Sequence, residues 1–251
     1  MTEVIGVAGC GRMGGPMLAN LQKAGFDARG YDPHTAAGVG SDIDAFCAGL
    51  TTLVTVVRDA SETDALLFDD QNVVARAQAL QVIVISSTLS PNYVKSLRAR
   101  IPANITLIDA PMSGAQVRAR AGTLTFMVGG DPAPIMPLLQ AMGDAIHPMG
   151  DFGAGMTGKV LNNMLAASHT AMTRLVLDWG DAQGVDEGKL LALIGTASGQ
   201  NWLASGFDDI EFARDGFSDD NSIGILAKDV GAALDSEPDG NTALPEAVQR
   251  A

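Results

Sequence analysis

Two hydrophobic patterns divide the chain near residue 150. Before this point, short apolar runs typical of buried parallel strands alternate with helical repeats. Strands are expected at 3–8, 27–31, 52–57, 82–87, 105–110, 123–130 and 145–148. Helices are expected from Gly14 to Gly25 and at 41–49, 61–68, 72–80, 90–99 and 132–143. This alternation predicts an α/β fold with a doubly wound, mostly parallel sheet of Rossmann type.

After residue 150 the strand signal stops and helical repeats dominate. Helices are expected at 155–183, 186–197, 201–212 and 222–235, with only 236–251 remaining beyond them. The pattern therefore predicts two domains, an α/β domain at 1–150 and an all-helical C-terminal domain at 151–251.

A glycine-rich turn follows the first expected strand directly. Its sequence is Gly9-Cys10-Gly11-Arg12-Met13-Gly14, and a helical repeat begins at its end. In this pattern Gly9 makes the tight turn, Gly11 leaves room for a pyrophosphate, and Gly14 allows helix and strand to pack closely. Backbone N–H groups at the start of the helix attract the phosphates. The turn therefore predicts that residues 1–150 bind a dinucleotide.

The second expected strand ends in an acid, Asp32, which lies 23 positions after Gly9, near the spacing of about 20 typical of dinucleotide-binding folds. A carboxylate there can accept hydrogen bonds from the ribose hydroxyls and would repel a 2′-phosphate. We therefore expect NAD, with NADP less favoured, although the nearby Arg29 weakens this preference. The alternative is that Asp32 is simply a turn residue before Pro33.

Further polar residues stand where later strands end, the edge at which doubly wound sheets bind ligands. Val57, Arg58 and Thr88 are expected to line the cofactor. Ser113 and Gly114 offer a hydroxyl and a backbone N–H group that can hold a carboxylate. Plain caps and a Pro/Ser/Gly turn are the alternatives at these positions.

The start of the helical half contains a lysine in an unusual setting. Gly150, Gly153 and Gly155 precede Lys159, and Asn163 follows one helical turn later on the same face. Glycines permit close backbone approach, so a ligand can come near this lysine. A solvated lysine on an ordinary interdomain helix is the alternative.

Composition narrows the classes of partner. The 251 residues carry a formal net charge of −13, which argues against nucleic acid and anionic membrane surfaces as partners. No apolar stretch reaches the roughly 20 residues that span a bilayer, and the two cysteines show neither a disulfide framework nor metal spacing. We expect a cytoplasmic protein without a metal.

Four stretches of the chain resemble the signatures of the β-hydroxyacid dehydrogenase family, whose members include 3-hydroxyisobutyrate dehydrogenases and which is related to 6-phosphogluconate dehydrogenase. The stretches occur in the order found in the family and span nearly the whole chain. They are Gly9–Gly25 (GCGRMGGPMLANLQKAG), Asp109–Gly122 (DAPMSGAQVRARAG), Gly150–Asn163 (GDFGAGMTGKVLNN) and Lys228–Asp235 (KDVGAALD).

The resemblance implies roles for individual residues. Lys159 matches the catalytic lysine, and Asn163 the asparagine that positions substrate and lysine. Lys228 matches a lysine that reaches the cofactor from the helical domain, and family members form dimers or tetramers through that domain. Family members usually continue with another helix or two after the position of Asp235, so the resemblance implies that the helical domain at 151–251 is shortened. The segment implied to anchor the substrate is Ser113, Gly114 and Ala115, with Ala115 where many members have glycine.

The expected reaction is reversible hydride transfer between nicotinamide and a small, anionic 3-hydroxy acid or its semialdehyde. Lys159 would act as general acid and base, since burial beside a cofactor lowers a lysine pKa from its usual value of about 10.4. An imine or semialdehyde reductase is one alternative, although imine reductases usually replace this lysine. A non-catalytic nucleotide-binding protein is the other.

Overall fold

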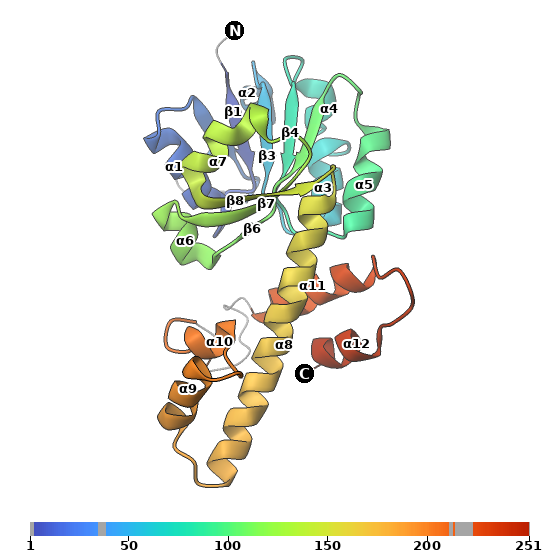
Figure 1. The fold of residues 1–251 in the computed structure, drawn as a ribbon. Helices are drawn as coiled ribbons and strands as arrows, with labels where there is room; N and C mark the ends of the chain where they lie inside the picture. The colour runs from blue at the N-terminus through green and yellow to red at the C-terminus, as the bar shows by residue number, and fades with distance from the viewer. Residues whose placement is uncertain (1–2, 35–38, 211–212, 214–222, 251) are drawn as a thin grey trace. The chain divides into compact units, whose positions relative to one another are not determined.

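The computed structural model describes residues 3–34, 39–210, 213 and 223–250. The chain divides into two compact units, Met1–Lys159 and Val160–Ala251. Figure 1 shows the fold and labels most of its helices and strands.

An eight-stranded sheet forms the centre of the first unit, in the order β2-β1-β3-β4-β5-β7-β6, with β8 beside β7. Neighbouring strands from β2 to β5 are parallel, so the fold has the expected α/β class with a mostly parallel sheet. The strands are β1 (Ile5–Ala8), β2 (Ala28–Tyr31), β3 (Thr52–Thr55), β4 (Val82–Ile85), β5 (Thr106–Asp109), β6 (Met112–Ser113), β7 (Leu124–Gly129) and β8 (Gly143–Gly150).

Helices cover both faces of this sheet (Figure 1). On β4, Ile83 and Ile85 belong to one hydrophobic cluster and Val84 to the other, because successive strand side chains point to opposite faces. Leu97 of α5 packs in the first cluster and Met17 of α1 in the second. The helices are α1 (Gly14–Lys23), α2 (Ile43–Cys47), α3 (Ala60–Leu67), α4 (Val73–Arg76), α5 (Pro91–Arg100), α6 (Ala115–Ala121) and α7 (Met136–Met142), with the 3₁₀ helix η1 (Ala133–Ile135) before α7.

The sheet departs from the expected pattern at β7, which runs antiparallel to both β5 and β6. Neither β6 nor α6 was expected from the sequence. The two elements occupy the short segment between β5 and β7, where α6 buries only Ala119 and ends at Gly122 in a left-handed conformation. A helix with one buried residue has no apolar repeat, so the pattern of the sequence contained no signal for it.

The second unit is helical, as expected. It is built by α8 (Ala154–Ala182), which begins within the first unit, and by α9 (Glu187–Thr196), α10 (Trp202–Ser205), α11 (Ile223–Leu234) and α12 (Ala243–Arg250). Leu177, Leu203 and Phe207 form its small core. The helix expected at 201–212 is short because it is capped at Gly206, and residues 211–212 lie outside the described part. Helix α12 was not expected, and Gln249 joins it to α11 through the Ala227 carbonyl (2.9 Å).

Candidate active site

The glycine turn joins β1 to α1 with almost no space to spare. Gly9 has φ +89°, and a Cβ atom there would lie 2.5 Å from the Val56 carbonyl oxygen. A Cβ atom on Gly14 would lie 1.9 Å from the Gly9 carbonyl oxygen. At Gly11, by contrast, a Cβ atom would meet no protein atom within 4 Å. The turn therefore packs tightly at Gly9 and Gly14 and leaves the open space at Gly11 that the approach of a pyrophosphate requires.

Asp32 is tied to this turn. One of its carboxylate oxygens accepts the Cys10 N–H (2.9 Å) and the other accepts the His34 N–H (2.9 Å). Each carboxylate oxygen has two lone pairs, so both can still accept a ribose hydroxyl. The Arg29 guanidinium donates instead to the Ala48 carbonyl. The residues present thus fit the adenosine side of a dinucleotide.

The middle residues of the turn differ in exposure. Arg12 is exposed, Met13 is half-buried and Cys10 is buried. The Cys10 thiol lies 3.4 Å from the Val7 carbonyl oxygen, and burial raises its pKa to about 11. Cys10 is therefore a neutral packing residue at physiological pH, and its place in the site comes from its backbone N–H.

The strand-end residues Val57, Arg58 and Thr88 follow β3 and β4 at the same edge of the sheet. Val57 and Thr88 are half-buried, whereas Arg58 is exposed. The Arg58 backbone N–H (2.8 Å) and Nε (2.5 Å) both donate to the Glu62 carboxylate. This ion pair raises the pKa of Arg58, so its charge is already shared with a neighbouring acid.

The expected substrate anchor lies at the start of α6. Ser113 pairs with Thr125 on β7, and Gly114 has φ +134°. Ala115 has φ +52°, a left-handed conformation that costs an L-residue roughly 1–2 kcal/mol. This conformation explains physically why glycine suits the position of Ala115. Strained backbone of this kind is concentrated at ligand-binding sites.

Lys159 lies in the second turn of α8, and only 7% of it is exposed. The start of α8 is fixed by Asp109, whose carboxylate accepts the N–H groups of Gly153 (2.6 Å) and Met156 (2.5 Å). Asp109 belongs to one of the four matching stretches, but no local pattern in the sequence predicted a role for it.

In the second unit, a buried acid links two of the expected site residues. The Asn163 amide donates to the Asp229 carboxylate (2.6 Å), and the Lys228 ammonium lies 3.2 Å from the other oxygen of that carboxylate. Asp229 is fully buried and Asn163 is 7% exposed, whereas Lys228 is half-exposed. Sequence reasoning missed Asp229, and the available signal was an acid on the same helix face as Leu226 and Val230.

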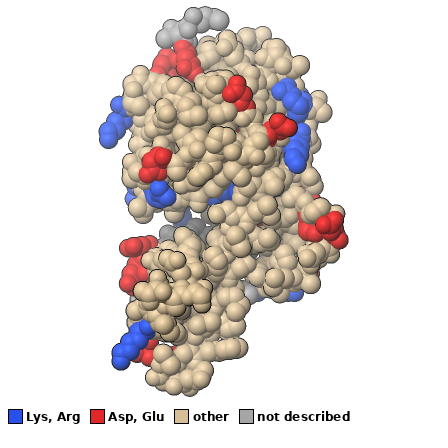
Figure 2. Space-filling model, viewed as in Figure 1, with Lys and Arg blue, Asp and Glu red and all other residues tan. Residues whose placement is uncertain are grey.

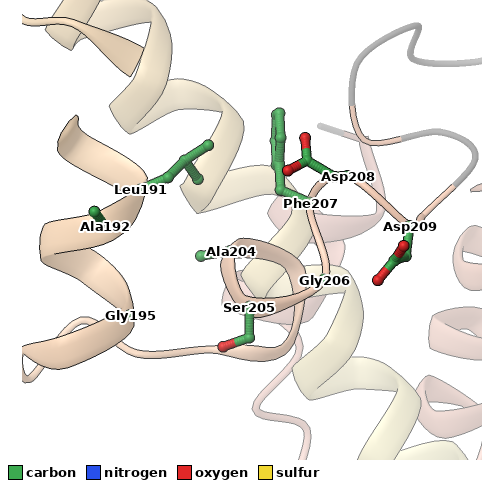
Figure 3. A pocket seen from close by; sticks show the side chains of 9 residues that line it. All are labelled: Leu191, Ala192, Gly195, Ala204, Ser205, Gly206, Phe207, Asp208 and Asp209. Carbon is green, nitrogen blue, oxygen red and sulfur yellow. The ribbon is translucent and has the colours of Figure 1, made fainter. Parts of the chain in front are cut away.

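A cavity of about 440 Å³ lies elsewhere in the second unit, between α9 and the segment from Ala204 to Asp209 (Figure 3). None of the expected site residues lines it, so it plays no part in the site described above. Within the described ranges of the chain, no cluster of acids, histidines and cysteines could hold a metal ion. In the same ranges, no helix is long and apolar enough to cross a membrane.

Comparison with known families matches both halves of the chain. Residues 4–150 match the NAD binding domain of 6-phosphogluconate dehydrogenase. Residues 153–249 match the family described as NAD-binding of NADP-dependent 3-hydroxyisobutyrate dehydrogenase. The fold and its glycine turn thus define a nicotinamide-dependent oxidoreductase.

Characterised relatives resemble the chain over most of its length. A 3-hydroxyisobutyrate dehydrogenase from Pseudomonas aeruginosa is 33% identical, with 93% of this chain and 85% of the relative covered. An NAD-dependent L-serine dehydrogenase of the same organism is 31% identical, covering 96% and 89%. The structure of a Mycobacterium tuberculosis 3-hydroxyisobutyrate dehydrogenase with L-serine is 28% identical with a TM-score of 0.85, covering 100% and 92%.

The chain belongs to the 3-hydroxyisobutyrate dehydrogenase-like family. Its activity class is that of an NAD(P)-dependent 3-hydroxyacid dehydrogenase, as the sequence had indicated.

Proposed function

We propose that this protein oxidises a small 3-hydroxy acid of the size of 3-hydroxyisobutyrate or L-serine, with Lys159 as general acid and base. The observation that carries the assignment is the burial of Lys159 near the start of α8, with only 7% exposed. An ammonium group is costly to bury, and Lys159 stands where the family resemblance implies the catalytic lysine. The named relatives act on acids of this size.

In the oxidation direction, neutral Lys159 accepts the proton of the substrate hydroxyl as hydride leaves the carbon that bears this hydroxyl. In reduction, protonated Lys159 returns that proton to the carbonyl oxygen. The nicotinamide, when bound, accepts or supplies the hydride. Asn163 orients the reacting oxygen, while the Ser113 hydroxyl and the backbone N–H groups of Gly114 and Ala115 hold the substrate carboxylate.

We further propose that residues 1–150 hold the cofactor, with NAD preferred over NADP, and that 151–251 shape the substrate pocket. Asp32 supports the preference because its negative charge opposes a 2′-phosphate. The cations Arg29 and Arg58 are engaged with the Ala48 carbonyl and the Glu62 carboxylate. Lys228 is assigned to the cofactor from the helical half.

A homo-oligomer through the helical domain is also proposed. Large apolar side chains on one face of α8 are exposed, a feature typical of an interaction surface. On the side of the molecule that Figure 2 draws, most of the surface belongs to residues other than Lys, Arg, Asp and Glu. The side chains are Leu161 (48%), Leu165 (58%), Met172 (56%), Leu175 (39%), Val176 (37%) and Trp179 (60%). Light scattering on the native chain and on Leu165→Glu tests this surface.

Both cysteines are free thiols, which supports a cytoplasmic location.

Turnover of a panel of 3-hydroxy acids with NAD and NADP tests the function. Lys159→Ala should lower kcat by about 10²- to 10⁴-fold, the usual contribution of a general acid or base, and leave NADH binding intact. Lys189→Ala, an exposed lysine of α9, is the matched control. Near-native turnover by Lys159→Ala would remove the assignment.

A further inference from the structure

Asp109 ends β5 and is fully buried. One carboxylate oxygen accepts the Gly153 N–H at 2.6 Å, and the other accepts the Met156 N–H at 2.5 Å. The N–H groups in the first turn of a helix have no partner within that helix, and α8 begins at Ala154. The side chain of Asp109, at the end of β5, thus caps α8, although Asp109 and Gly153 are 44 residues apart in the sequence.

The surrounding backbone is shaped around this carboxylate. A Cβ atom on Gly129 would lie 2.1 Å from one oxygen of Asp109, and a Cβ atom on Gly155 would lie 2.9 Å from the other. The same atom on Gly155 would lie 2.5 Å from the Met127 carbonyl oxygen. Two glycines therefore allow β7 and the first turn of α8 to close around Asp109, which holds the start of the helix against the sheet.

The stability of the fold alone does not explain a buried acid at position 109. Burial raises the pKa of Asp109, and the N–H groups of Gly153 and Met156 offset only part of that effect. The charge of Lys95, whose side chain lies against Gly153, also acts to lower the pKa of Asp109. A buried carboxylate is favoured over an apolar residue when it defines one geometry, and two short hydrogen bonds at a helix start do so.

We propose that Asp109 is a positioning residue, whose carboxylate sets the placement of α8 and thereby that of Lys159. The inference rests on the function proposed above for Lys159. Met156 and Lys159 are three residues apart, about 4.5 Å along a helix axis. A helix is stiff over this length, so a shift of its first turn moves the lysine by a similar amount. All these residues belong to the first unit.

The first test compares Asp109→Asn with the native chain. Asparagine has the same size, but it offers one acceptor oxygen and turns an N–H₂ group toward the other backbone N–H. We expect kcat to fall by about 10- to 100-fold, since a misplacement of about 1 Å can cost 10²-fold. The Kd for NADH should stay within about twofold, because the glycine turn is untouched. A native kcat in a folded Asp109→Asn would overturn the proposal.

The second test asks whether the loss passes through Lys159. In Lys159→Ala, added ethylamine or propylamine can replace the missing ammonium group, and a free amine is not attached to α8. The double variant Lys159→Ala/Asp109→Asn is therefore compared with Lys159→Ala, each with the amine and without it. Their rates should differ by less than about threefold, because two residues that share one role have non-additive effects. An equal loss in both backgrounds would show that Asp109 acts independently of Lys159 and would overturn the proposal.

The two hypotheses fail in different experiments. Full turnover by Lys159→Ala, with Asp109 intact, would remove the role of the lysine and this inference with it. If Asp109→Asn does not fold, Gly155→Ala replaces it. The added methyl group would lie 2.5 Å from the Met127 carbonyl oxygen and 2.9 Å from the Asp109 carboxylate, so it displaces the first turn of α8 while Asp109 stays chemically unchanged. The same Lys159-dependent loss of kcat is then expected, and its absence would overturn the proposal.

Discussion

The amide of Asn163 donates a 2.6 Å hydrogen bond to Asp229, an acid with no exposed surface. A carboxylate can only accept, so this bond fixes which end of the amide faces Asp229. The Asn163 oxygen is consequently turned the other way, where the Asn162 amide lies 3.3 Å from it. Asp229 therefore determines the orientation of a residue to which we assign substrate positioning.

We expect Asp229→Asn to lower kcat by about 10- to 100-fold, since a hydrogen bond to a charged group contributes about 1.5–3 kcal/mol. The new side chain also competes as a donor, so the Asn163 amide can turn over. Steady-state kinetics with the preferred acid measure the loss, and Asp239→Asn on an exposed position of the same unit is the control. Equal kcat values for the two variants would contradict the role of Asp229.

Two glycine substitutions in one turn should have different consequences for cofactor binding and for stability. Gly11→Ala adds a methyl group that meets no protein atom, so the Tm should be almost unchanged while the Kd for NADH rises by about tenfold or more as the pyrophosphate is displaced. Gly14→Ala drives a methyl group into the Gly9 carbonyl oxygen, so the Tm should fall as well. Calorimetry and fluorescence titration separate the two effects. A Gly11→Ala variant that binds NADH normally would place the phosphates elsewhere.

Asp32→Asn should shift the choice of cofactor. The amide oxygen can still accept the Cys10 N–H, but the charge that opposes a 2′-phosphate is lost. We expect the ratio of NADPH to NADH affinity to rise by about tenfold, equivalent to about 1.4 kcal/mol. Titration with both cofactors measures the ratio. Asp27→Asn, an exposed acid before β2, should leave it unchanged, and equal ratios for the two variants would refute the role of Asp32.

The pKa of Cys10 predicts an alkaline loss of stability. Burial raises this pKa from 9.0 to about 11, so the folded state retains the proton that the unfolded state releases. The free energy of unfolding should be unaffected below pH 9 and should fall as the pH rises toward about 11, by roughly 2 kcal/mol. Urea unfolding between pH 8 and about 11 should show this loss in the native chain and a smaller one in Cys10→Ala. Parallel curves would contradict it.

The elements that repeat a local pattern could be predicted from the sequence. Apolar runs identified parallel strands such as β1 and β3, because both faces of the sheet are covered and every residue of these two strands is buried. The glycine turn was equally visible, since close packing at Gly9 and Gly14 leaves no other residue type possible. Lys159 and Asn163 could be paired because helical periodicity alone places them on one face.

The contacts that organise the site could not be predicted in this way. Asp109 and Asp229 bind groups 44 and 66 residues away, and no local pattern encodes such a partner. Each acid follows or interrupts an apolar segment, which a sequence presents equally well as a strand end or a solvated helix position. The antiparallel direction of β7 could not be predicted for a related reason, since it depends on the short elements β6 and α6 that precede it.

Helix α8 runs without a break through the division between the two units, which falls directly after Lys159. A recombination point between Lys159 and Val160 would leave the lysine and its Asp109 cap with the nucleotide half. Asn163, Lys228 and Asp229 would pass together to the other half. Chimaeras with relatives joined at this point would inherit each group of contacts whole, so exchanging the helical half would leave Lys159 and the Asp109 contacts that hold its helix unchanged.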